Sequence, residues 1–360
     1  MGNSYCNERL KSARKILEST RLEGILFMSL ENIRYLCGFT GSDGAFILTK
    51  KESFFLTDSR YWTQAEEEVQ SSKIIHYYKK IDGMVSLLSD LKLRELGFES
   101  AALTFSIHRS LLKRLDHEIK LIPLENEIKN LRAVKDEQEL ALIHTAIDIS
   151  SKAFEHIVGI AKEGVSEREI AFEMEFFMKR NGAQALAFDL IVASGKRSAL
   201  PHGKASDKRI EKGDFILIDF GSMFQGYYCD QTRTLICGRA SPEQEKVYRV
   251  VKEAHDKAVE RIRPGVPLQE VDGAAREHIQ KCGYGEYFGH GTGHGIGLAV
   301  HEDPAVNKEN KDLVQDGMVF TVEPGIYIPD WGGVRIEDMV RVTPRGAEAL
   351  TCLSGELIVI

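Results

Sequence analysis

Residues of the types that bind divalent metal ions are concentrated in the second half of the 360-residue chain. The set consists of four acids and one histidine: Asp219, Asp230, His294, Glu323 and Glu337. This oxygen-rich set suits Mn(II), with Co(II) or Zn(II) as alternatives, and is unlike the thiolate set of a structural zinc site. Four carboxylates suffice to bridge two ions about 3.5–4 Å apart, which would deprotonate a bridging water and polarise a carbonyl.

The first pair of acids belongs to a predicted hairpin. Residues 215–218 are apolar and typical of a buried strand that ends at Asp219, and a second strand over residues 226–236 carries Asp230. A two-residue turn at Phe224–Gln225 would place Asp219 directly opposite Asp230, on one face of the hairpin. Two carboxylates so placed repel each other, and a cation between them removes the conflict.

The second pair of acids repeats this arrangement. Residues 319–322 form another apolar strand that ends at Glu323, and a polar turn at residues 329–333 leads to a return strand that carries Glu337. Arg335 shares a face with Glu337 by alternation. Acids that recur within two apolar hairpins are hard to explain as solvated surface residues.

A glycine-rich segment, residues 289–297, lies between the two hairpins and contains His290 and His294, with His301 following. Its five glycines allow the backbone to come close to a ligand. A phosphate-binding loop is the alternative, but no Walker lysine follows and the spacing is not that of a dinucleotide-binding loop. Three histidines in this context favour a metal or substrate site.

Two domains are expected from the length, with residues 1–130 as a small α/β domain and residues 131–360 as the domain that carries the acids. A helix capped by Asp136 begins the second domain, and Ser166 with Glu169 predicts a capping box at the next helix. Helices over residues 164–182 and 265–283 have matching starts and glycine stops, 101 residues apart. This offset predicts two α/β halves related by a pseudo-twofold axis, with the site between them.

Composition restricts the class of protein. The net charge of −7 argues against nucleic-acid binding, and the chain has no apolar run long enough to span a membrane. The N-terminus has no hydrophobic leader, and the six cysteines are scattered rather than paired in a motif. A cytoplasmic protein with reduced thiols is therefore expected.

These motifs together resemble the pita-bread metallopeptidases, in the branch of the Xaa-Pro aminopeptidases and Xaa-Pro dipeptidases (prolidases), over essentially the whole chain. In the first half, residues 35–42 and 56–61 resemble the creatinase-type N-terminal domain of that branch. In the second half the resemblance is carried by residues 218–221, 230–234, 290–297, 322–325 and 335–338.

The resemblance implies a role for each acid. Asp219 would chelate the first ion, Asp230 and Glu337 would bridge both ions, and His294 and Glu323 would complete the second. Glu323 would also carry a proton from the bridging water to the leaving nitrogen.

Other residues match positions around the ions in the same family. His202 and His301 would orient the substrate and stabilise the tetrahedral intermediate. The remaining groups would be His290, Arg335, Thr234 as a hydrogen-bond partner of a bridging carboxylate, and Phe188 as a wall of the pocket for the first substrate residue. For each of these groups a purely structural role is the alternative.

The function implied is that of a homodimeric Xaa-Pro aminopeptidase, which releases the first residue of peptides with proline in second position. The alternatives are a prolidase and a catalytically inactive pita-bread binding protein. Methionine aminopeptidase fits poorly with the N-terminal domain, and creatinase-like chemistry without metal fits poorly with five intact ligands. Residues 301–306 lack the arginine with which strict dipeptidases bind the substrate carboxylate, although Lys308 or a residue of the N-terminal domain could replace it.

Overall fold

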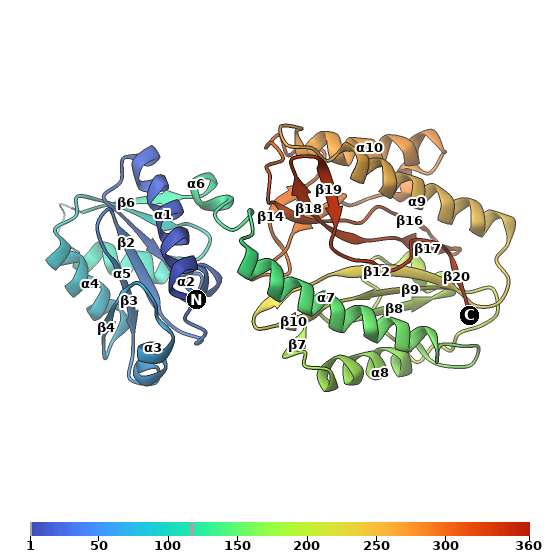
Figure 1. The fold of residues 1–360 in the computed structure, drawn as a ribbon, viewed down its shortest axis with the longest axis horizontal. Coiled ribbons are helices and arrows are strands. Elements are labelled where there is room, and N and C mark those ends of the chain that lie inside the picture. Colours follow the sequence, from blue (N-terminus) through green and yellow to red (C-terminus); the bar gives the residue numbers. More distant parts are fainter. Residues whose placement is uncertain (1, 116–118) are drawn as a thin grey trace. The chain divides into compact units, whose positions relative to one another are not determined.

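The computed structural model describes residues 2–115 and 119–360. The chain divides into two compact units, residues 1–132 and 133–360, both drawn as ribbons in Figure 1. Each unit combines helices with β-sheet, in agreement with the predicted mixed α/β class.

The first unit is built on one six-stranded sheet in the order β4-β3-β2-β1-β5-β6. Its strands are β1 (Gly24–Phe27), β2 (Ala45–Thr49), β3 (Ser53–Thr57), β4 (Lys73–His76), β5 (Glu95–Glu99) and β6 (Lys120–Leu124). Its helices are α1 (Gly2–Thr20), α2 (Leu30–Cys37), α3 (Trp62–Glu68), α4 (Lys80–Leu91), α5 (Phe105–Arg114) and α6 (Asn126–Lys129). Strand β1 pairs antiparallel with β2 and parallel with β5.

The second unit contains two larger sheets, in the orders β20-β12-β9-β8 and β14-β13-β15-β18-β19. Its first half comprises α7 (Glu137–Val158), α8 (Glu167–Arg180), β7 (Ala185–Leu186), β8 (Ile191–Ser194), η1 (Gly195–Ala199), β9 (Phe215–Phe220), β10 (Ser222–Phe224), β11 (Tyr227–Tyr228) and β12 (Gln231–Ile236). Its second half comprises α9 (Pro242–Arg261), α10 (Leu268–Lys281), η2 (Gly285–Tyr287), β13 (Gly293–Gly295), β14 (Glu302–Val306), β15 (Val319–Val322), β16 (Gly325–Ile328), β17 (Gly332–Arg335), β18 (Asp338–Thr343) and β19 (Gly346–Ala349), and β20 (Ile358–Val359) follows. In Figure 1 the strands lie between α7 and α8 on one side and α9 and α10 on the other.

The helix boundaries follow local signals in the sequence. Asp136 and Ser166 cap α7 and α8 in complete capping boxes, as predicted. The chain leaves α8 and α10 through Gly182 (φ 103°) and Gly283 (φ 89°), in the left-handed region that glycine adopts without strain.

The predicted duplication is visible in the backbone hydrogen bonds that precede α8 and α10. The amide of Gly164 donates to the carbonyl of Ile210, and the amide of Ile210 donates to the carbonyl of Val165. In the second half, Gly265 and Val314 make the corresponding pair of bonds, with Val266 as the second acceptor. The same pair of backbone hydrogen bonds therefore precedes the second helix of each half, as expected for a pseudo-twofold fold.

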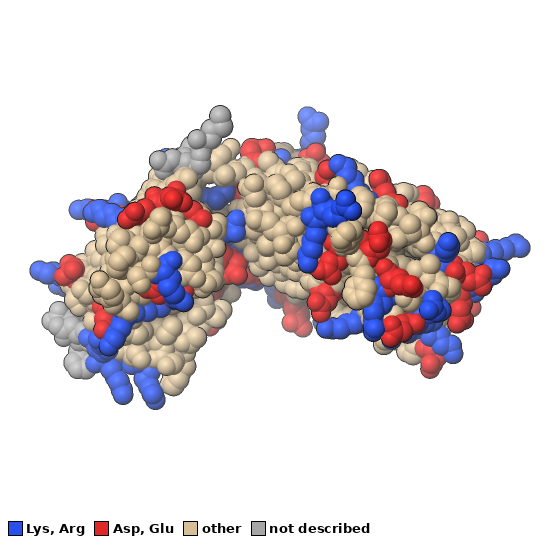
Figure 2. Space-filling model, turned by 90° about the horizontal axis from the view of Figure 1, so that it is seen from below, with Lys and Arg blue, Asp and Glu red and all other residues tan. Residues whose placement is uncertain are grey.

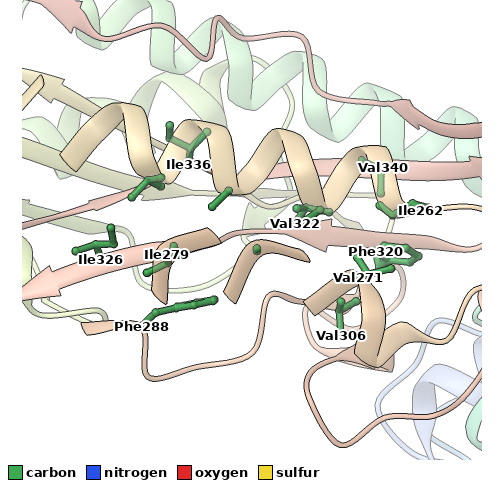
Figure 3. Packing of buried hydrophobic residues seen from close by; sticks show 14 of the residues in the cluster. Ile262, Val271, Ile279, Phe288, Val306, Phe320, Val322, Ile326, Ile336 and Val340 are labelled. Carbon is green, nitrogen blue, oxygen red and sulfur yellow. The ribbon is translucent and has the colours of Figure 1, made fainter. Parts of the chain in front are cut away.

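Alternation along β15 separates the core from the site. In β15, Phe320 and Val322 belong to the apolar cluster beneath α9 and α10, whereas Thr321 makes hydrogen bonds near Glu323. Figure 3 shows part of this cluster, with Val271 and Ile279 of α10 among its labelled side chains. Because successive side chains of a strand face opposite sides, burying one set points the other at the space between the halves.

The surface carries no large patch of one charge on the face shown in Figure 2, where acidic and basic side chains are interspersed. Among the helices of the described residues, none combines the length and apolar character that crossing a membrane requires.

Candidate metal centre

The register of the first hairpin differs from the predicted one. Asp219 of β9 pairs with Thr232 of β12, not with Asp230. The two-residue turn falls one position later than predicted, at Gln225 and Gly226, because both adopt positive φ angles of 44° and 76°. The change moves Asp230 by two positions relative to Asp219, so both acids still point to one face.

The second hairpin is interrupted at its acids. Strands β15 and β18 pair Val322 with Asp338, and strands β16 and β17 pair Gly325 with Arg335. The register is continuous across the break, so Glu323 lies opposite Glu337. The backbone amides of these two acids donate to other segments. Glu323 donates to the carbonyl of Thr292, and Glu337 donates to the carbonyl of Thr232.

His294 lies on β13, where its two neighbours must be glycine. A Cβ atom at Gly293 would lie 1.9 Å from the carbonyl oxygen of Thr321, and one at Gly295 would lie 2.2 Å from that of Asp303. Any larger residue would push β13 away from β14 or β15. The glycines that the sequence showed around His294 therefore serve close strand packing.

The four acids and His294 converge on one cavity of about 660 Å³ in the second unit. The Nε2 atom of His294 lies 3.6 Å from Oδ2 of Asp230 and 3.4 Å from Oε1 of Glu323. One ligand atom from each of Asp230, His294 and Glu337 lies within 4.8 Å of the other two. Asp219 lines the same cavity, where its Oδ2 accepts a hydrogen bond from Nη2 of Arg335 at 2.5 Å.

Three carboxylate oxygens in this cluster are buried without a hydrogen-bond partner among the described residues. They are Oδ1 of Asp219, Oδ1 of Asp230 and Oε1 of Glu337. Leaving a buried acceptor unsatisfied costs about 1–3 kcal/mol, and more when it is charged. Divalent cations in the cavity would supply partners for these oxygens, so the donor set fits a metal centre.

Burial and repulsion between the carboxylates also shift the pKa values of the acids in the cluster. Burial raises the pKa of Asp230 well above its usual range, and the nearby carboxylates of Glu337 and Asp219 raise it further. Burial and then the charge of Glu323 do the same to the pKa of Glu337. Without a cation, these carboxyl groups bind protons more readily than ordinary carboxyl groups do. A bound cation favours their ionised form instead.

The tautomer of His294 suits metal binding. Its Nδ1 atom lies 3.0 Å from the carbonyl oxygen of Gly295, which can only accept a hydrogen bond, so Nδ1 carries the proton. Nε2, which faces Asp230 and Glu323, is then free to bind a cation. Burial lowers the pKa of His294, in keeping with a neutral ring.

Arg335 connects the first acid to a buried network. Besides Asp219, its guanidinium donates to the hydroxyl of Thr232 at 3.1 Å and to that of Tyr327 at 2.7 Å. His290 donates from Nδ1 to the carbonyl of Gly291 at 2.7 Å, so its Nε2 accepts the proton of the Tyr327 hydroxyl at 2.9 Å. This chain fixes the orientation of groups that line the cavity.

The hydrogen bond predicted for Thr234 is made by Thr232 instead. The Thr232 hydroxyl donates to Oε2 of Glu337 at 2.6 Å. The Thr234 hydroxyl donates to the carbonyl of Arg335 at 3.0 Å and does not reach a carboxylate of the cluster. The shifted register explains the exchange, because Thr232 occupies the position opposite Asp219.

Further residues bring their side chains to the cavity. His202 and His301 are exposed on its wall, and the ring of His301 lies 4.3 Å from that of His294, centroid to centroid. Phe188 is half-buried and also lines the cavity. Burial lowers the pKa of His301, and the adjacent His294 lowers it further.

Sequence reasoning missed several groups of this site. Tyr327 was not singled out, although its alternation with Glu323 along the strand placed it on the same face. Arg233 was also missed: its side chain is buried, and its Nη1 donates to the carbonyls of Thr232 and Glu337 at 2.9 and 2.6 Å. Asp189 and Lys204 line the cavity as well, and no motif indicated them.

The comparisons with known families and proteins agree with this geometry. The model of metallopeptidase family M24 matches residues 141–344, and that of the creatinase/prolidase N-terminal domain matches residues 9–134. An Xaa-Pro dipeptidase of Pyrococcus horikoshii is 40% identical over 355 residues, which cover 98% of this chain and 99% of that protein.

Solved structures give the same result. The structure of an Xaa-Pro dipeptidase from Bacillus anthracis is 41% identical with a TM-score of 0.94, covering 99% of this chain and 100% of that one. The structure of an X-Pro aminopeptidase from Thermotoga maritima is 40% identical with a TM-score of 0.88, covering 97% and 100%.

Proposed function

Because the chain belongs to metallopeptidase family M24, we propose that it is an Xaa-Pro aminopeptidase, which releases the N-terminal residue from peptides with proline in second position. The observation that carries this proposal is the set of three unpartnered, buried carboxylate oxygens on residues that line one cavity with His294. Relatives named as proline-specific peptidases, both dipeptidase and aminopeptidase, supply the substrate class.

The ligands proposed for two divalent ions are Asp219, Asp230, His294, Glu323 and Glu337, with Mn(II) as the preferred metal. When bound, such ions supply an activated water as nucleophile and polarise the peptide carbonyl. Burial raises the pKa of Glu323, which suits a carboxylate that takes up a proton and delivers it to the proline nitrogen as that nitrogen leaves.

The groups on the cavity wall would act on the peptide itself. His202 and His301 reach the cavity with exposed rings and would donate hydrogen bonds to the peptide carbonyl as it becomes tetrahedral. Phe188 would pack against the side chain of the first substrate residue. Arg335, Tyr327 and His290 would hold Asp219 and the cavity wall in place through their hydrogen bonds.

The same proposal extends to properties of the whole protein. Residues 1–130 would form a creatinase-type N-terminal domain and residues 131–360 the catalytic domain of a cytoplasmic homodimer. None of the six cysteines, all of them described residues, forms a disulfide, in keeping with a reducing compartment. Light scattering of the purified protein measures the oligomeric state, and cell fractionation measures the location.

The decisive experiment is hydrolysis of an Xaa-Pro peptide series of increasing length by protein loaded with Mn(II). We expect release of the first residue from dipeptides, tripeptides and longer peptides, and no cleavage when alanine replaces proline. Cleavage of Xaa-Pro dipeptides together with failure to cleave any tripeptide would establish the prolidase alternative. Absence of bound metal, together with no effect of Asp230→Ala, would establish a non-catalytic binding protein.

A further inference from the structure

A buried ion pair lies in the second unit, outside the cavity. The Nζ atom of Lys135 lies 2.8 Å from Oε1 of Glu302, and the two side chains are 0% and 5% exposed. Neither residue is among the described residues that line the cavity. Burying two charges costs solvation free energy that neutral side chains of similar size would avoid. A role in holding a segment in place therefore explains the pair better than stability alone.

The backbone around Lys135 is fixed by its neighbours. The amide of Lys135 donates to the carbonyl of Gly317 at 2.9 Å. The preceding residue, Val134, forms a β-bridge with Met318, just before β15. The following residue, Asp136, caps α7. The ammonium group is therefore carried by a segment that is held between the start of a strand and the start of a helix.

The other end of the pair belongs to the loop that carries His301. Residues 296–301 connect β13 to β14, and Glu302 is the first residue of β14. While Oε1 of Glu302 binds Lys135, its Oε2 accepts a hydrogen bond from the amide of Ala299 at 3.3 Å. One carboxylate thus connects the end of the loop, its middle and Lys135.

The loop also packs closely against the ion pair at Gly297. A Cβ atom at Gly297 would lie 2.6 Å from Oε1 of Glu302 and 3.0 Å from Cε of Lys135. The carbonyl of Gly297 accepts a hydrogen bond from the amide of Tyr228 at 2.8 Å. The loop backbone therefore has little room to move while the pair is intact.

His301 and Glu302 are adjacent but have different surroundings. The carboxylate of Glu302 is buried beside Lys135, whereas the ring of His301 is exposed on the cavity wall. That ring lies 4.3 Å from the ring of His294, centroid to centroid. Because the two residues are neighbours in the chain, anchoring the side chain of Glu302 restricts where the ring of His301 can lie.

We propose that Lys135 and Glu302 are positioning residues, which hold residues 296–302 in place and thereby fix His301 on the cavity wall. This inference rests on the proposed function, which assigns His301 to the peptide carbonyl. A displacement of about 1 Å, caused by a change far from the reacting atoms, can lower a rate by about 100-fold. The ion pair would therefore affect catalysis without touching the substrate.

The first test measures kcat on an Xaa-Pro peptide and the bound metal of Mn(II)-loaded variants. Lys135→Met leaves the buried carboxylate of Glu302 without this cation, and should lower kcat by about 10- to 100-fold with metal content unchanged. When combined with His301→Gln, it should lower kcat less than about twofold further, because residues that act through one another are not additive.

The matched control is Lys208→Met. It removes a lysine from a partly buried ion pair with Asp214, and neither residue is among the described residues that line the cavity. This variant should keep kcat within about twofold of the wild type. Full additivity of Lys135→Met with His301→Gln, or an unchanged kcat in Lys135→Met, would overturn the proposal.

A double variant separates position from stability. Lys135→Met combined with Glu302→Gln buries neither charge, so its Tm should return toward that of the wild type. Its kcat should remain low, because the loop has still lost its charged anchor. Recovery of kcat together with Tm would mean that the pair acts only through stability.

Hydrogen–deuterium exchange follows the loop itself and requires no substrate. In both Lys135 variants the amides of residues 296–302 should exchange about tenfold faster or more, while those of α8 stay unchanged. Failure of the wild-type protein to cleave any Xaa-Pro peptide is a separate outcome, which rejects the proposed function. The exchange rates then decide the role of the ion pair, because unchanged rates in residues 296–302 would reject it.

Discussion

The two halves of the second unit share one backbone plan but contribute differently to the site. Each half places two acids at the ends of strands, Asp219 and Asp230 in the first and Glu323 and Glu337 in the second. Each is also braced by a buried carboxylate from its second helix. Glu167 accepts hydrogen bonds from the amide and hydroxyl of Ser194, and Asp272 does the same for Thr292.

The two halves differ in the side chains that surround the acids. The second half adds His294, and also Tyr327 and Arg335, which belong to one buried hydrogen-bond network. The first half adds a loop with His202 and Lys204, whose side chains are exposed. The comparison indicates that duplication fixed the positions of the acids, whereas the segments that do not repeat bring different side chains to the cavity.

The largest expected effect tests whether both halves are required. Asp219→Asn and Glu323→Gln should each lower kcat by more than about 100-fold, since loss of a ligand exceeds the 10- to 100-fold effect of losing a group behind it. Enzyme assays and metal analysis measure the loss, with the exposed Asp207→Asn as a control. Full activity in Asp219→Asn would show that this acid does not contribute to the centre.

The next effect compares one histidine from each half. His202→Gln and His301→Gln should each lower kcat by about 100-fold, the usual effect of removing one donor to a developing oxyanion. Bound metal should be unchanged in both, which metal analysis of the purified variants determines. The exposed His144→Gln is the control, and loss of metal in His301→Gln would reassign that residue to the metal centre.

A smaller effect tests the register of the first hairpin. Thr232→Val removes a hydrogen bond to Glu337 and one from Arg335, and should weaken metal binding by about 10- to 100-fold. Thr234→Val, which touches only the backbone of Arg335, should change it less. Competition with a chelator measures the affinity, and the reverse order of effects would favour the predicted register.

The smallest effect concerns the pH dependence of stability without metal. Burial and like charge raise the pKa of Asp230 and Glu337 in the folded protein above the unfolded values of about 4. The folded state therefore binds more protons, and the metal-free protein loses this stability as pH rises through the raised values.

Stability conferred by metal should accordingly grow as pH rises above the unfolded values of about 4 and through the raised folded values, by up to about 1.4 kcal/mol per pH unit for each proton released. The difference in Tm between Mn(II)-loaded and chelator-treated protein, followed across this range, measures it. A difference that is independent of pH would mean that these acids are ionised before metal binds.

Much of this arrangement could be predicted from the sequence, for physical reasons that differ between residues. The acids were found because each interrupts an apolar strand, and the capping boxes at Asp136 and Ser166 because they depend only on local chemistry. The register was wrong because the turn was placed before Gly226, although glycine at the second turn position is the usual signal for that hairpin type. The families matched agree with the resemblance, fold and enzyme class inferred from the motifs.

Other features depend on contacts between distant segments. Arg233 satisfies its donors with carbonyls of residues 337, 353 and 354, and nothing near it in the sequence indicates this. Lys204 reaches the cavity through an isolated bridge to Ile191, without the alternation that marks a strand. Such pairings follow from the tertiary fold rather than from local periodicity.

The two-strand separation between Asp219 and Lys204 has a consequence for inhibitor design. An inhibitor that joined a metal-binding group, such as a hydroxamate or phosphinate, to an anionic group would contact both the acid cluster and the exposed ammonium group of Lys204. A rigid ring between these groups would avoid the entropy cost of ordering a flexible linker. Relatives with an uncharged residue at the position of Lys204 would bind such a compound less tightly, which gives a structural basis for selectivity within the family.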